Sequence, residues 1–338
     1  AMAELLDIPV EVIPTKNSLP YHRIIEEIDR GTIKGLWVIA TNPVHSWGNK
    51  EAAIAALEKL DFLVVQDLYD TTETAGVADL LLPAAGSGEK EGTFINSERR
   101  LGTVQKVMEP PGEALSDFDI FKRIRDAWGC RDILSEWESP EAAFRILRRT
   151  SRGRACDITG IDGYRMIRER GGIQWPYPED DPDDEPERRL FADGRFFTPS
   201  GKARLLTDSI TPLPEVPDEE YPFMLLTGRG TVAQFHTQTR TSKVEMLRKL
   251  YPAELHAQIN PADAERLGIE DGEAVRVFSR RGSADALAEV TEEVRPGHVF
   301  LPMHYYDTNK LTYPVFDPYS HQPGYKAAAV RVAKGGSS

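Results

Sequence analysis

Three short apolar runs are separated by polar or helical segments in the first quarter of the chain. IKGLWVIA (33–40), DFLVVQD (61–67) and ADLLLPA (78–84) are almost continuously apolar, which is typical of strands buried on both faces of a sheet. Strands and helical patterns that alternate at this spacing predict a parallel sheet with right-handed crossovers. Because ligands bind such sheets at the carboxyl ends of the strands, the residues just after each run are candidates for a site.

Helical patterns lie between and after these runs. KEAAIAALEKL (50–60) has apolar residues at helical spacing, and TTETAGVA is expected to begin a second helix capped by Thr71 or Thr72. SDFDIFKRIRDAWG (116–129) is a capped amphipathic helix, and SPEAAFRILRRT (139–150) is another. The order of elements up to residue 84 is therefore βαβαβ.

The pattern changes after the segment PYPEDDPDDEPERR (176–189), whose acidic and proline-rich composition predicts a solvated loop or linker. FFTPSGKARLL, YPFMLLTGRG, EAVRVFSRRGSADALAEV and GHVFLPMHYY have the composition of strands, and RRGS and RPGH that of turns. NPADAERLGI predicts one short helix, with Asn260 as its cap and Gly268 at its end. The last third of the chain is thus expected to form a mostly β domain, barrel-like in shape.

These patterns predict an α/β domain followed by a β domain, with the fold class α/β. A chain of 338 residues is long enough for two domains with separate cores. The expected division is an α/β domain over 1–150, a connecting segment over 151–219 that includes the acidic loop, and a barrel domain over 220–335.

Composition narrows the classes of function. With 41 Lys and Arg against 54 Asp and Glu, the net charge of −13 argues against a nucleic-acid or anionic-membrane surface, although a local basic pocket for a phosphate remains open. No apolar stretch is long enough to span a bilayer, and the N-terminal residues lack the pattern of an export signal. Cys130 and Cys156 form neither a disulfide framework nor a CxxC metal site, so a cytoplasmic location is expected. The opening AMAELLDIP is interpreted as a cut made inside a longer protein.

Polar residues follow the first two predicted strands. Thr41 and Asn42 could bond a base edge or a ribose, while the alternative is an ordinary turn. Gln66 and Asp67 end the second strand, where a carboxylate commonly holds ribose hydroxyls or the N–H pair of a guanine, and the helix start at Thr71 would present N–H groups to a phosphate. The alternative is that Asp67 only caps that helix. No GxGxxG follows either strand, so an ordinary NAD site is not supported.

Two later loops are rich in hydrogen-bond donors. TGRGTVAQFHTQTRTSK (227–243) suits an anionic ligand that makes many hydrogen bonds. DTNKLTYPVFDPYSHQPGYKAAAVRV (307–332) is either a packed C-terminal loop or a second lining of the same site. GEKEGTFINSERR (88–100) is a charged loop whose simplest interpretation is a solvated one. The candidate residues of the first two loops are Arg229, Gln234, His236, Thr237, Thr239, Arg240, Asn309, Asp317, Tyr325 and Lys326.

Catalytic motifs are missing from the sequence. There is no HExxH, no GxSxG, no P-loop and no cysteine beside a plausible base. The chain therefore contains groups that can bind a ligand but no recognisable reactive centre.

Taken together, these stretches resemble the C-terminal half of a molybdopterin oxidoreductase of the dimethyl sulfoxide reductase superfamily. The matching pieces run in the family's order and cover nearly the whole chain. They are GLWVIATNPVHSW, VVQDLYDTTETAGVADLLLPAAGSGEKEGTFINSERR, SDFDIFKRI, YPFMLLTGR, HTQTRT, INPADAERLGIEDGEAVRVFSRRG and FDPYSHQPGYKAAAVRV.

The resemblance implies that bis(molybdopterin guanine dinucleotide), with its molybdenum, binds between a Rossmann-like α/β domain and a double-psi-type β-barrel. In the family, the strand-end turns receive the guanine and ribose of one dinucleotide arm, and the barrel loops contact the rest of the cofactor. Carried over to this sequence, the cofactor-binding residues are Thr41, Asn42, Gln66, Asp67, Thr71, Asp117, Arg229, Gln234, His236, Thr237, Thr239, Asn309, Tyr325 and Lys326.

Within the superfamily, CDITGIDGYRMIRERGGIQWPYP, GRFFTPSGKARL and NKLTYPVFDPYSHQPGYK are most similar to the assimilatory nitrate reductases. This implies nitrate as the substrate, the N-terminal half of the same enzyme and an electron donor as partners, and the reduction of nitrate to nitrite. Formate dehydrogenase of the same superfamily is the alternative, to be decided by the upstream metal ligand and its neighbouring base.

Parts of the family pattern are missing. The [4Fe-4S] domain and the metal ligand lie upstream of anything matched, so the isolated chain is expected to be inactive and to ligate no metal. Gly76 stands where some relatives carry a basic side chain, and Arg99 is the candidate to replace it; other catalytic residues stay unassigned. Two further alternatives are a stand-alone cofactor-binding module and a subunit of a split enzyme whose partner carries the cysteines.

Overall fold

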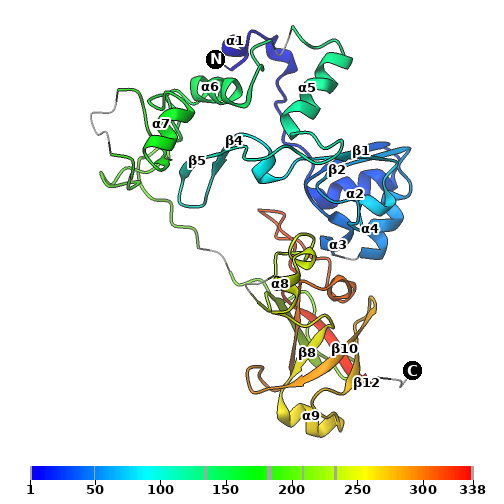
Figure 1. Ribbon diagram of the computed structural model, residues 1–338. Helices are drawn as coiled ribbons and strands as arrows, with labels where there is room; N and C mark the ends of the chain where they lie inside the picture. The colour runs from blue at the N-terminus through cyan, green and yellow to red at the C-terminus, as the bar shows by residue number, and fades with distance from the viewer. Residues whose placement is uncertain are drawn as a thin grey trace. The chain divides into compact units, whose positions relative to one another are not determined.

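The computed structural model describes residues 2–48, 50–132, 135–180, 185–207, 209–231 and 234–335 (Figure 1). The chain forms two compact units: the first contains Ala1–Ser18 and Pro83–Ser209, and the second contains Leu19–Leu82 and Ile210–Ser338. The second unit thus joins the predicted parallel strands to the predicted barrel. The domain boundaries expected near residues 150 and 219 stay predictions, because compact units and sequence domains divide a chain differently.

A three-stranded sheet in the second unit has the order β1-β2-β3, with β1 at Gly35–Ile39, β2 at Phe62–Asp67 and β3 at Leu80–Pro83. β1 and β2 are parallel, with Gly35 opposite Phe62 and Ile39 opposite Gln66. Parallel register places the carboxyl ends of β1 and β2 beside one another, as the alternating pattern predicted. The polar turns after both strands therefore meet at one edge of the sheet.

Helices α2 (Tyr21–Asp29), α3 (Pro43–Ser46) and α4 (Lys50–Leu57) lie together beside this sheet (Figure 1). Their apolar side chains pack together in a cluster that contains Ile28, Val44, Ala56 and Leu57. Val38, Leu63 and Val65 form a second cluster from the strands themselves. The continuous apolar runs of the sequence are explained by this burial.

The prediction of a helix over TTETAGVA is wrong. Only a single 3-10 turn, η2 (Ala75–Val77), forms there, although Thr72 Oγ1 does accept the Ala75 N–H at 3.1 Å. The Asp79 carboxylate accepts the Leu63 N–H at 2.6 Å and so ties the chain to β2 directly before β3 begins.

The rest of the second unit is a closed barrel of six strands (Figure 1). Around the barrel the order is β10-β8-β11-β7-β12-β9, with parallel pairs β8–β10 and β7–β11 and antiparallel pairs elsewhere. Closure leaves no strand edge open, and alternate side chains fill the interior. The strands are β7 (Phe223–Gly228), β8 (His256–Ile259), β9 (Ala274–Phe278), β10 (Ser283–Val290), β11 (His298–Pro302) and β12 (Ala328–Lys334).

Among the described residues, the barrel strands are connected by four short helical elements, of which η4 (Thr241–Lys243) is the first. Helix α9 (Pro261–Leu267) is capped as predicted, since Asn260 accepts the Ala262 N–H at 3.0 Å and Gly268 ends the helix at a φ of 66°. Helix α8 (Glu245–Arg248) precedes β8, and the 3-10 helix η5 (Tyr306–Lys310) follows β11.

Some strand predictions were wrong. FFTPSGKARLL forms no strand within its described residues, and Leu205 and Leu206 are exposed there. In contrast, AAAVRV, which was interpreted as part of a loop, forms most of β12, with Ala328, Ala329, Val330 and Val332 buried. Strand propensity alone did not distinguish these two segments, because a segment forms a strand only where another strand pairs with it.

The first unit contains a three-stranded antiparallel sheet of β4 (Gly92–Ile95), β5 (Arg100–Val104) and β6 (Ile173–Gln174). Helices α5 (Asp117–Ala127) and α6 (Pro140–Thr150) form as predicted, and the Ser116 and Ser139 side chains accept N–H groups of their first turns. Leu101, Phe144 and Tyr164 belong to its core. The shorter elements of this unit are α1 (Met2–Leu6), η1 (Val10–Val12), η3 (Ser87–Glu89) and α7 (Tyr164–Glu169).

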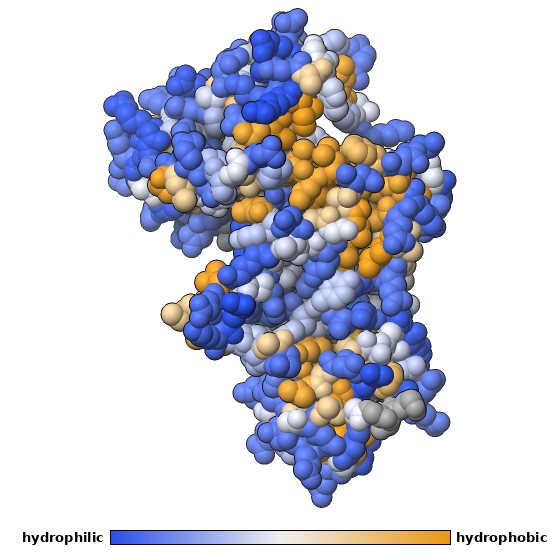
Figure 2. Space-filling model, turned by 45° about the vertical axis from the view of Figure 1, so that its right-hand side comes forward, coloured by the Kyte–Doolittle hydropathy of each residue, from blue (hydrophilic) through white to orange (hydrophobic). Residues whose placement is uncertain are grey.

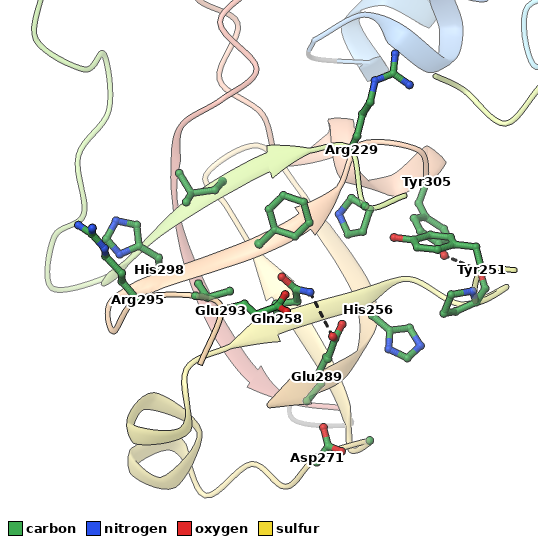
Figure 3. Close-up of a pocket in the computed structure, with 18 residues that line it drawn as sticks. Arg229, Tyr251, His256, Gln258, Asp271, Glu289, Glu293, Arg295, His298 and Tyr305 are labelled. Atoms are coloured by element: carbon green, nitrogen blue, oxygen red, sulfur yellow. Dashed lines mark hydrogen bonds between the residues drawn. The ribbon is translucent and has the colours of Figure 1, made fainter. Parts of the chain in front are cut away.

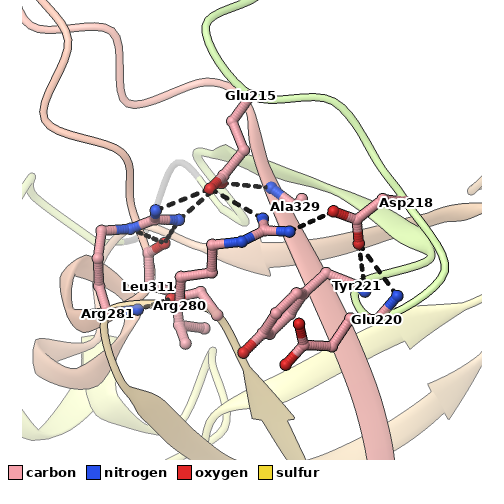
Figure 4. A network of polar contacts seen from close by, with 9 residues as sticks. Glu215, Asp218, Glu220, Tyr221, Arg280, Arg281, Leu311 and Ala329 are labelled. Atoms are coloured by element: carbon pink, nitrogen blue, oxygen red, sulfur yellow. Dashed lines mark hydrogen bonds and ion pairs between the residues drawn. The ribbon is translucent and has the colours of Figure 1, made fainter.

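A buried carboxylate fastens the segment before the barrel to the barrel itself (Figure 4). Glu215 accepts hydrogen bonds from Arg281 at 2.7 and 2.9 Å, from Arg280 at 3.2 Å and from the Ala329 N–H at 2.8 Å. Burial alone would raise the pKa of Glu215, but these donors outweigh it and the pKa is lowered. Arg280 also pairs with Asp218.

Figure 2 shows a largely hydrophilic surface with separate apolar areas. Exposed apolar residues of the second unit include Ile39 and Phe62 on the parallel strands. No helix within the described ranges has the length and apolar character needed to cross a bilayer.

Candidate functional site

A cavity of about 260 Å³ lies in the second unit where β1 and β2 end. We call it the strand-end cavity. One side is formed by residues that follow the two strands, and the other by the loop between β7 and β8. Its lining residues are Ala40, Thr41, Asn42, Ser46, Asp67, Phe235, His236, Thr237, Thr239 and Arg240. Six of the predicted cofactor residues are among them.

The strand-end cavity combines one acceptor group with several donors. The Asp67 side chain is 7% exposed, and its Oδ1 accepts the Leu68 N–H at 2.6 Å. Hydroxyls of Thr41, Thr237 and Thr239 and the guanidinium of Arg240 line the same space. A carboxylate suits the N–H or hydroxyl groups of a nucleoside, and hydroxyls with a guanidinium suit a phosphate. The chemistry of this donor set fits a dinucleotide.

A second cavity, of about 200 Å³, shares Thr237 and Thr239 with the first. We call it the histidine cavity. Thr71 lines it together with side chains that the sequence did not single out. These residues are His45, Thr71, Thr72, Glu73, Thr237, Gln238, Thr239, Ser242, Lys243, His304, Tyr305 and Tyr306.

A polar network holds the turns after β1 and β2 together. Asn42 donates from Nδ2 to Glu73 at 2.6 Å, and its Oδ1 accepts the Thr74 hydroxyl at 2.7 Å. His45 Nδ1 bonds the other Glu73 oxygen at 3.0 Å. Burial would raise the pKa of Glu73, but the hydrogen bonds from His45 and Asn42 lower it to about 2. Glu73 is therefore ionised at neutral pH, and Asn42 has a structural role in addition to lining the strand-end cavity.

Burial lowers the pKa of two histidines of the barrel loops. Burial lowers the pKa of His304, although backbone carbonyls of His236 and Phe235 oppose the shift. Burial also lowers the pKa of His236, and the nearby charges of His45, Arg229, His304 and Lys326 act in the same direction. Neutral imidazoles are expected at these positions above the ordinary histidine pKa.

Tyr325 lies at a third cavity of about 480 Å³, which Thr41 and His236 also line. The Tyr325 hydroxyl donates to the Ser46 carbonyl at 2.7 Å, and the Tyr325 carbonyl accepts the Thr227 hydroxyl at 2.5 Å. A Cβ added at Gly48 would lie 3.3 Å from the Tyr325 ring, so the ring packs closely on that backbone. Tyr325 thus connects the α/β strands to the barrel.

Other predicted residues lie outside the strand-end cavity. Gln66 is fully buried within β2. Gln234 is buried and accepts the Thr241 hydroxyl at 2.6 Å, while Asn309 donates to the His45 carbonyl at 2.9 Å. Lys326 lies 3.4 Å from the Thr227 carbonyl. The contacts of Gln234 and Asn309 are structural ones that fix the loops around the cavities.

Asp117 and Arg99 belong to the first unit. Asp117 pairs with Lys90 beside a separate cavity of about 330 Å³. Arg99 has a φ of 67°, and its guanidinium donates to the carbonyls of Trp175 and Arg188. These two bonds favour a structural role for Arg99 over contact with a substrate.

A further cavity, of about 940 Å³, lies on the barrel, beside strands β7, β8, β10 and β11 (Figure 3). Of the predicted residues only Arg229 lines it, and Figure 3 shows the guanidinium of Arg229 pointing away from the strands. Gln258 bonds Glu289 at 3.2 Å, and Tyr305 bonds the Pro252 carbonyl at 2.6 Å. Because charges of both signs are spread along this groove, we place the candidate site at the strand ends.

Sequence reasoning missed His45, Glu73, His304 and Lys243. His45 lies within the quoted turn TNPVHSW and Glu73 within TTETAG, but only the fold shows that the two side chains meet. His304 was hidden in a run interpreted simply as a strand. Among the described residues, His304 Nε2 is buried without a hydrogen-bond partner. The spacing of residues in the sequence could not predict this, because the residues around His304 lie far apart along the chain.

No group of three or more His, Cys, Asp or Glu within the described ranges could hold a metal ion. Cys130 and Cys156 are free thiols of the first unit.

Two family models match the chain. The model described as molybdopterin oxidoreductase matches residues 12–127, and the one described as molydopterin dinucleotide binding domain matches residues 223–329. The first match includes β1, β2 and the turns after them, and the second includes most of the barrel. Both sides of the strand-end cavity therefore fall within matched segments.

Similar proteins include both nitrate reductases and formate dehydrogenases. The assimilatory nitrate reductase catalytic subunit of Bacillus subtilis is 36% identical over 98% of this chain and 46% of its own length. The nitrate reductase of Synechocystis sp. is 38% identical over 88% of this chain and 42% of its own. The F420-dependent formate dehydrogenase subunit alpha of Methanocaldococcus jannaschii is 36% identical over 92% of this chain and 45% of its own. The chain thus spans about half the length of these relatives.

A solved structure has the same fold. Acetylene hydratase from Pelobacter acetylenicus superposes with a TM-score of 0.67 over 92% of this chain and 46% of that protein, at 17% identity. The expected α/β fold with a parallel sheet and a barrel is confirmed. The two family models cover the segments on both sides of the strand-end cavity, and these relatives are 36–38% identical to this chain. The chain therefore belongs to the molybdopterin oxidoreductase family.

Proposed function

We propose that this chain is the cofactor-holding C-terminal portion of a molybdenum oxidoreductase that binds bis(molybdopterin guanine dinucleotide). The observation that supports this is the strand-end cavity, where Asp67 from one strand end meets Thr237, Thr239 and Arg240 from the barrel loop. An acceptor on one side and donors on the other match the two halves of a nucleotide.

Each side of the cavity has its own role in this proposal. Asp67 accepts hydrogen bonds from guanine or ribose, while Thr41 and Asn42 line the same region. Thr237, Thr239 and Arg240 bind phosphate, and the guanidinium of Arg240 supplies a local positive charge although the chain as a whole is acidic. Tyr325 and Lys326 are proposed to contact the pterins.

The complete enzyme is proposed to reduce nitrate to nitrite in the cytoplasm. When bound, the molybdenum cofactor supplies the two-electron chemistry, and this chain's residues bind and orient it. The N-terminal half of the enzyme would provide a [4Fe-4S] cluster and the metal ligand, and an electron-donor protein or domain would reduce it. Nitrate reductases among the relatives support this substrate.

Formate oxidation is the second candidate function. The formate dehydrogenase of M. jannaschii is as similar to this chain as the nitrate reductase of B. subtilis, each at 36% identity. Turnover of the complete protein with nitrate and a reduced dye, compared with formate and an oxidised dye, separates the two. Nitrate reduction without formate oxidation is the expected result, and the reverse would overturn the choice of substrate.

The cofactor role is tested by Asp67→Ala in the complete protein. Asp61→Ala is a matched control, because Asp61 is an exposed carboxylate at the opposite end of the same strand. We expect Asp67→Ala to lower the molybdenum content several-fold, with a much smaller change in the thermal unfolding of the cofactor-free protein. Full molybdenum content in Asp67→Ala would contradict the role of this cavity.

A further inference from the structure

The two ends of one loop are held by a single buried carboxylate (Figure 4). The loop, residues 312–327, lies between η5 and β12, and we call it the C-terminal loop. Just beyond its end, the Ala329 N–H donates to Glu215 at 2.8 Å. Just before its start, the Leu311 carbonyl accepts hydrogen bonds from Arg281 at 3.0 and 3.3 Å, and Arg281 also donates to Glu215. Glu215 therefore closes the base of the loop.

The ion pair at this base is shielded from solvent. The Glu215 side chain is 8% exposed and the Arg281 side chain is 14% exposed. Both oxygens of Glu215 accept from the guanidinium of Arg281, at 2.9 and 2.7 Å, which is the two-bond geometry typical of the stronger arginine–carboxylate pairs. A buried charge that loses its partner is costly, so a change to either side chain should loosen the base of the loop.

The turn between β9 and β10 is shaped to bring Arg281 to this place. A Cβ added at Gly282 would lie 3.2 Å from the Lys310 carbonyl oxygen, so the turn packs closely on the end of η5. The Arg281 N–H donates to the Ser279 hydroxyl at 3.2 Å, which fixes the backbone of the turn. The guanidinium carbon of Arg281 also lies 5.1 Å from the centre of the Tyr313 ring, within the range of a cation–π contact with the loop itself.

The far part of the C-terminal loop contacts helix α2 instead of the barrel. Phe316 and Pro323 pair across this part as an isolated β-bridge. The Phe316 ring stacks on the His22 ring of α2 with 4.2 Å between their centres. Lys326 follows the bridge and precedes the base along the chain. Its position is therefore set by the contact with α2 on one side and by the base at Glu215 on the other.

We propose that Glu215 is a positioning residue: it closes the base of the C-terminal loop and thereby holds Lys326 in place for the cofactor. This rests on the proposed function, in which Tyr325 and Lys326 contact the cofactor. Tyr325 is fixed by a contact of its own, since its hydroxyl donates to the Ser46 carbonyl at 2.7 Å. Among the described residues the Lys326 ammonium group makes one long hydrogen bond, at 3.4 Å to the Thr227 carbonyl. Lys326 therefore depends more than Tyr325 on the course of the loop.

Hydrogen exchange in the complete protein measures the closure of the loop directly. Glu215→Gln keeps the shape of the side chain but removes its charge. We expect backbone amides of residues 312–327 to exchange about 10- to 100-fold faster in this variant, while those of β8 and β11 exchange as in the wild type. Asp285→Asn breaks an exposed ion pair with Arg276 on the same hairpin, so it is the matched control and should change neither. Arg281→Lys, which loses the forked contact, should give the same increase if Glu215→Gln does not fold.

A second measurement separates positioning from a role in stability alone. The molybdenum content of the complete protein is determined for Glu215→Gln, for Lys326→Ala and for the double variant. We expect each single variant to lower the content several-fold. The double variant should retain as much molybdenum as Lys326→Ala, because Glu215 acts through Lys326 and the two effects are not additive. If Glu215 only stabilised the barrel, the two losses would multiply.

Two results would overturn the inference: unchanged exchange of residues 312–327 in both Glu215→Gln and Arg281→Lys, or multiplied losses of molybdenum in the double variant. Failure of the proposed function is recognised separately, because Asp67→Ala and Lys326→Ala would then both retain full molybdenum content. If Asp67→Ala loses molybdenum while Glu215→Gln retains it, the cofactor role stands and Glu215 is left with a role in stability alone.

Discussion

At the scale of single residues, the position of a polar side chain at the end of a buried strand follows from the course of the backbone alone. Thr41, Asn42 and Asp67 line one cavity because parallel strands end at a common edge. Gln66 shows the limit of this argument, since it belongs to the buried part of β2 itself. The pairing of His45 with Glu73 depends on how two turns fold against each other, which no spacing rule contains.

Lys326 provides a test at this scale. Among the described residues its ammonium group makes one long hydrogen bond, at 3.4 Å to the Thr227 carbonyl, so we expect it to be available for a ligand. We expect Lys326→Ala to weaken cofactor retention in the complete protein several-fold, with the free energy of unfolding changed by less than about 0.5 kcal/mol. Lys334→Ala, which breaks an ion pair with Glu273 at the far end of β12, is the control. Unchanged turnover and full occupancy in Lys326→Ala would return this lysine to a packing role.

At the scale of elements, the sequence predicted the strands and helices whose apolar residues recur at a regular spacing. It did not predict the elements that form only because a neighbouring strand pairs with them. Both ends of α9 were predicted correctly from Asn260, Pro261 and Gly268. The segment TTETAGVA has suitable capping residues but forms only one 3-10 turn, and Asp79 directly after it accepts the N–H of Leu63 in β2. β12 resembled a loop because it is mostly alanine and valine after an irregular stretch, yet β7 and β9 pair with it on both sides.

The junction of α4 with η5 contains a buried lysine whose protonation can be tested. Lys50 is 2% exposed, donates to the Tyr306 carbonyl at 3.0 Å and lies over the Tyr306 ring. Burial lowers its pKa from 10.5 to about 7. Between these two values the unfolded chain binds more protons than the folded one, so stability rises with pH across this window.

We therefore expect the free energy of unfolding of the wild type, relative to Lys50→Met, to increase by roughly 1 kcal/mol per pH unit between pH 7 and pH 10. Chemical denaturation of both proteins at several pH values in this range measures the difference. Lys59→Met, which removes an exposed partner of Asp29, should show no such trend. A difference that stays constant with pH would mean that Lys50 keeps its proton throughout.

At the scale of the whole molecule, the parallel strands and the barrel fold into one compact unit, although about 130 residues separate them along the chain. The charged network around Glu215 ties the segment before the barrel to β12 and to the β9–β10 turn. This arrangement explains why the candidate site draws on both family-model segments. A linear division of the sequence into successive domains could not show it.

We propose that this chain holds a cofactor with two guanine nucleotides. The most direct measurement is to purify the complete protein, release its cofactor by acid, and quantify guanine nucleotide and molybdenum in the same sample. We predict two guanine nucleotides for every molybdenum, with both contents falling together in Asp67→Ala. A protein with molybdenum but no guanine nucleotide, or with nucleotide retained fully in Asp67→Ala, would contradict the account.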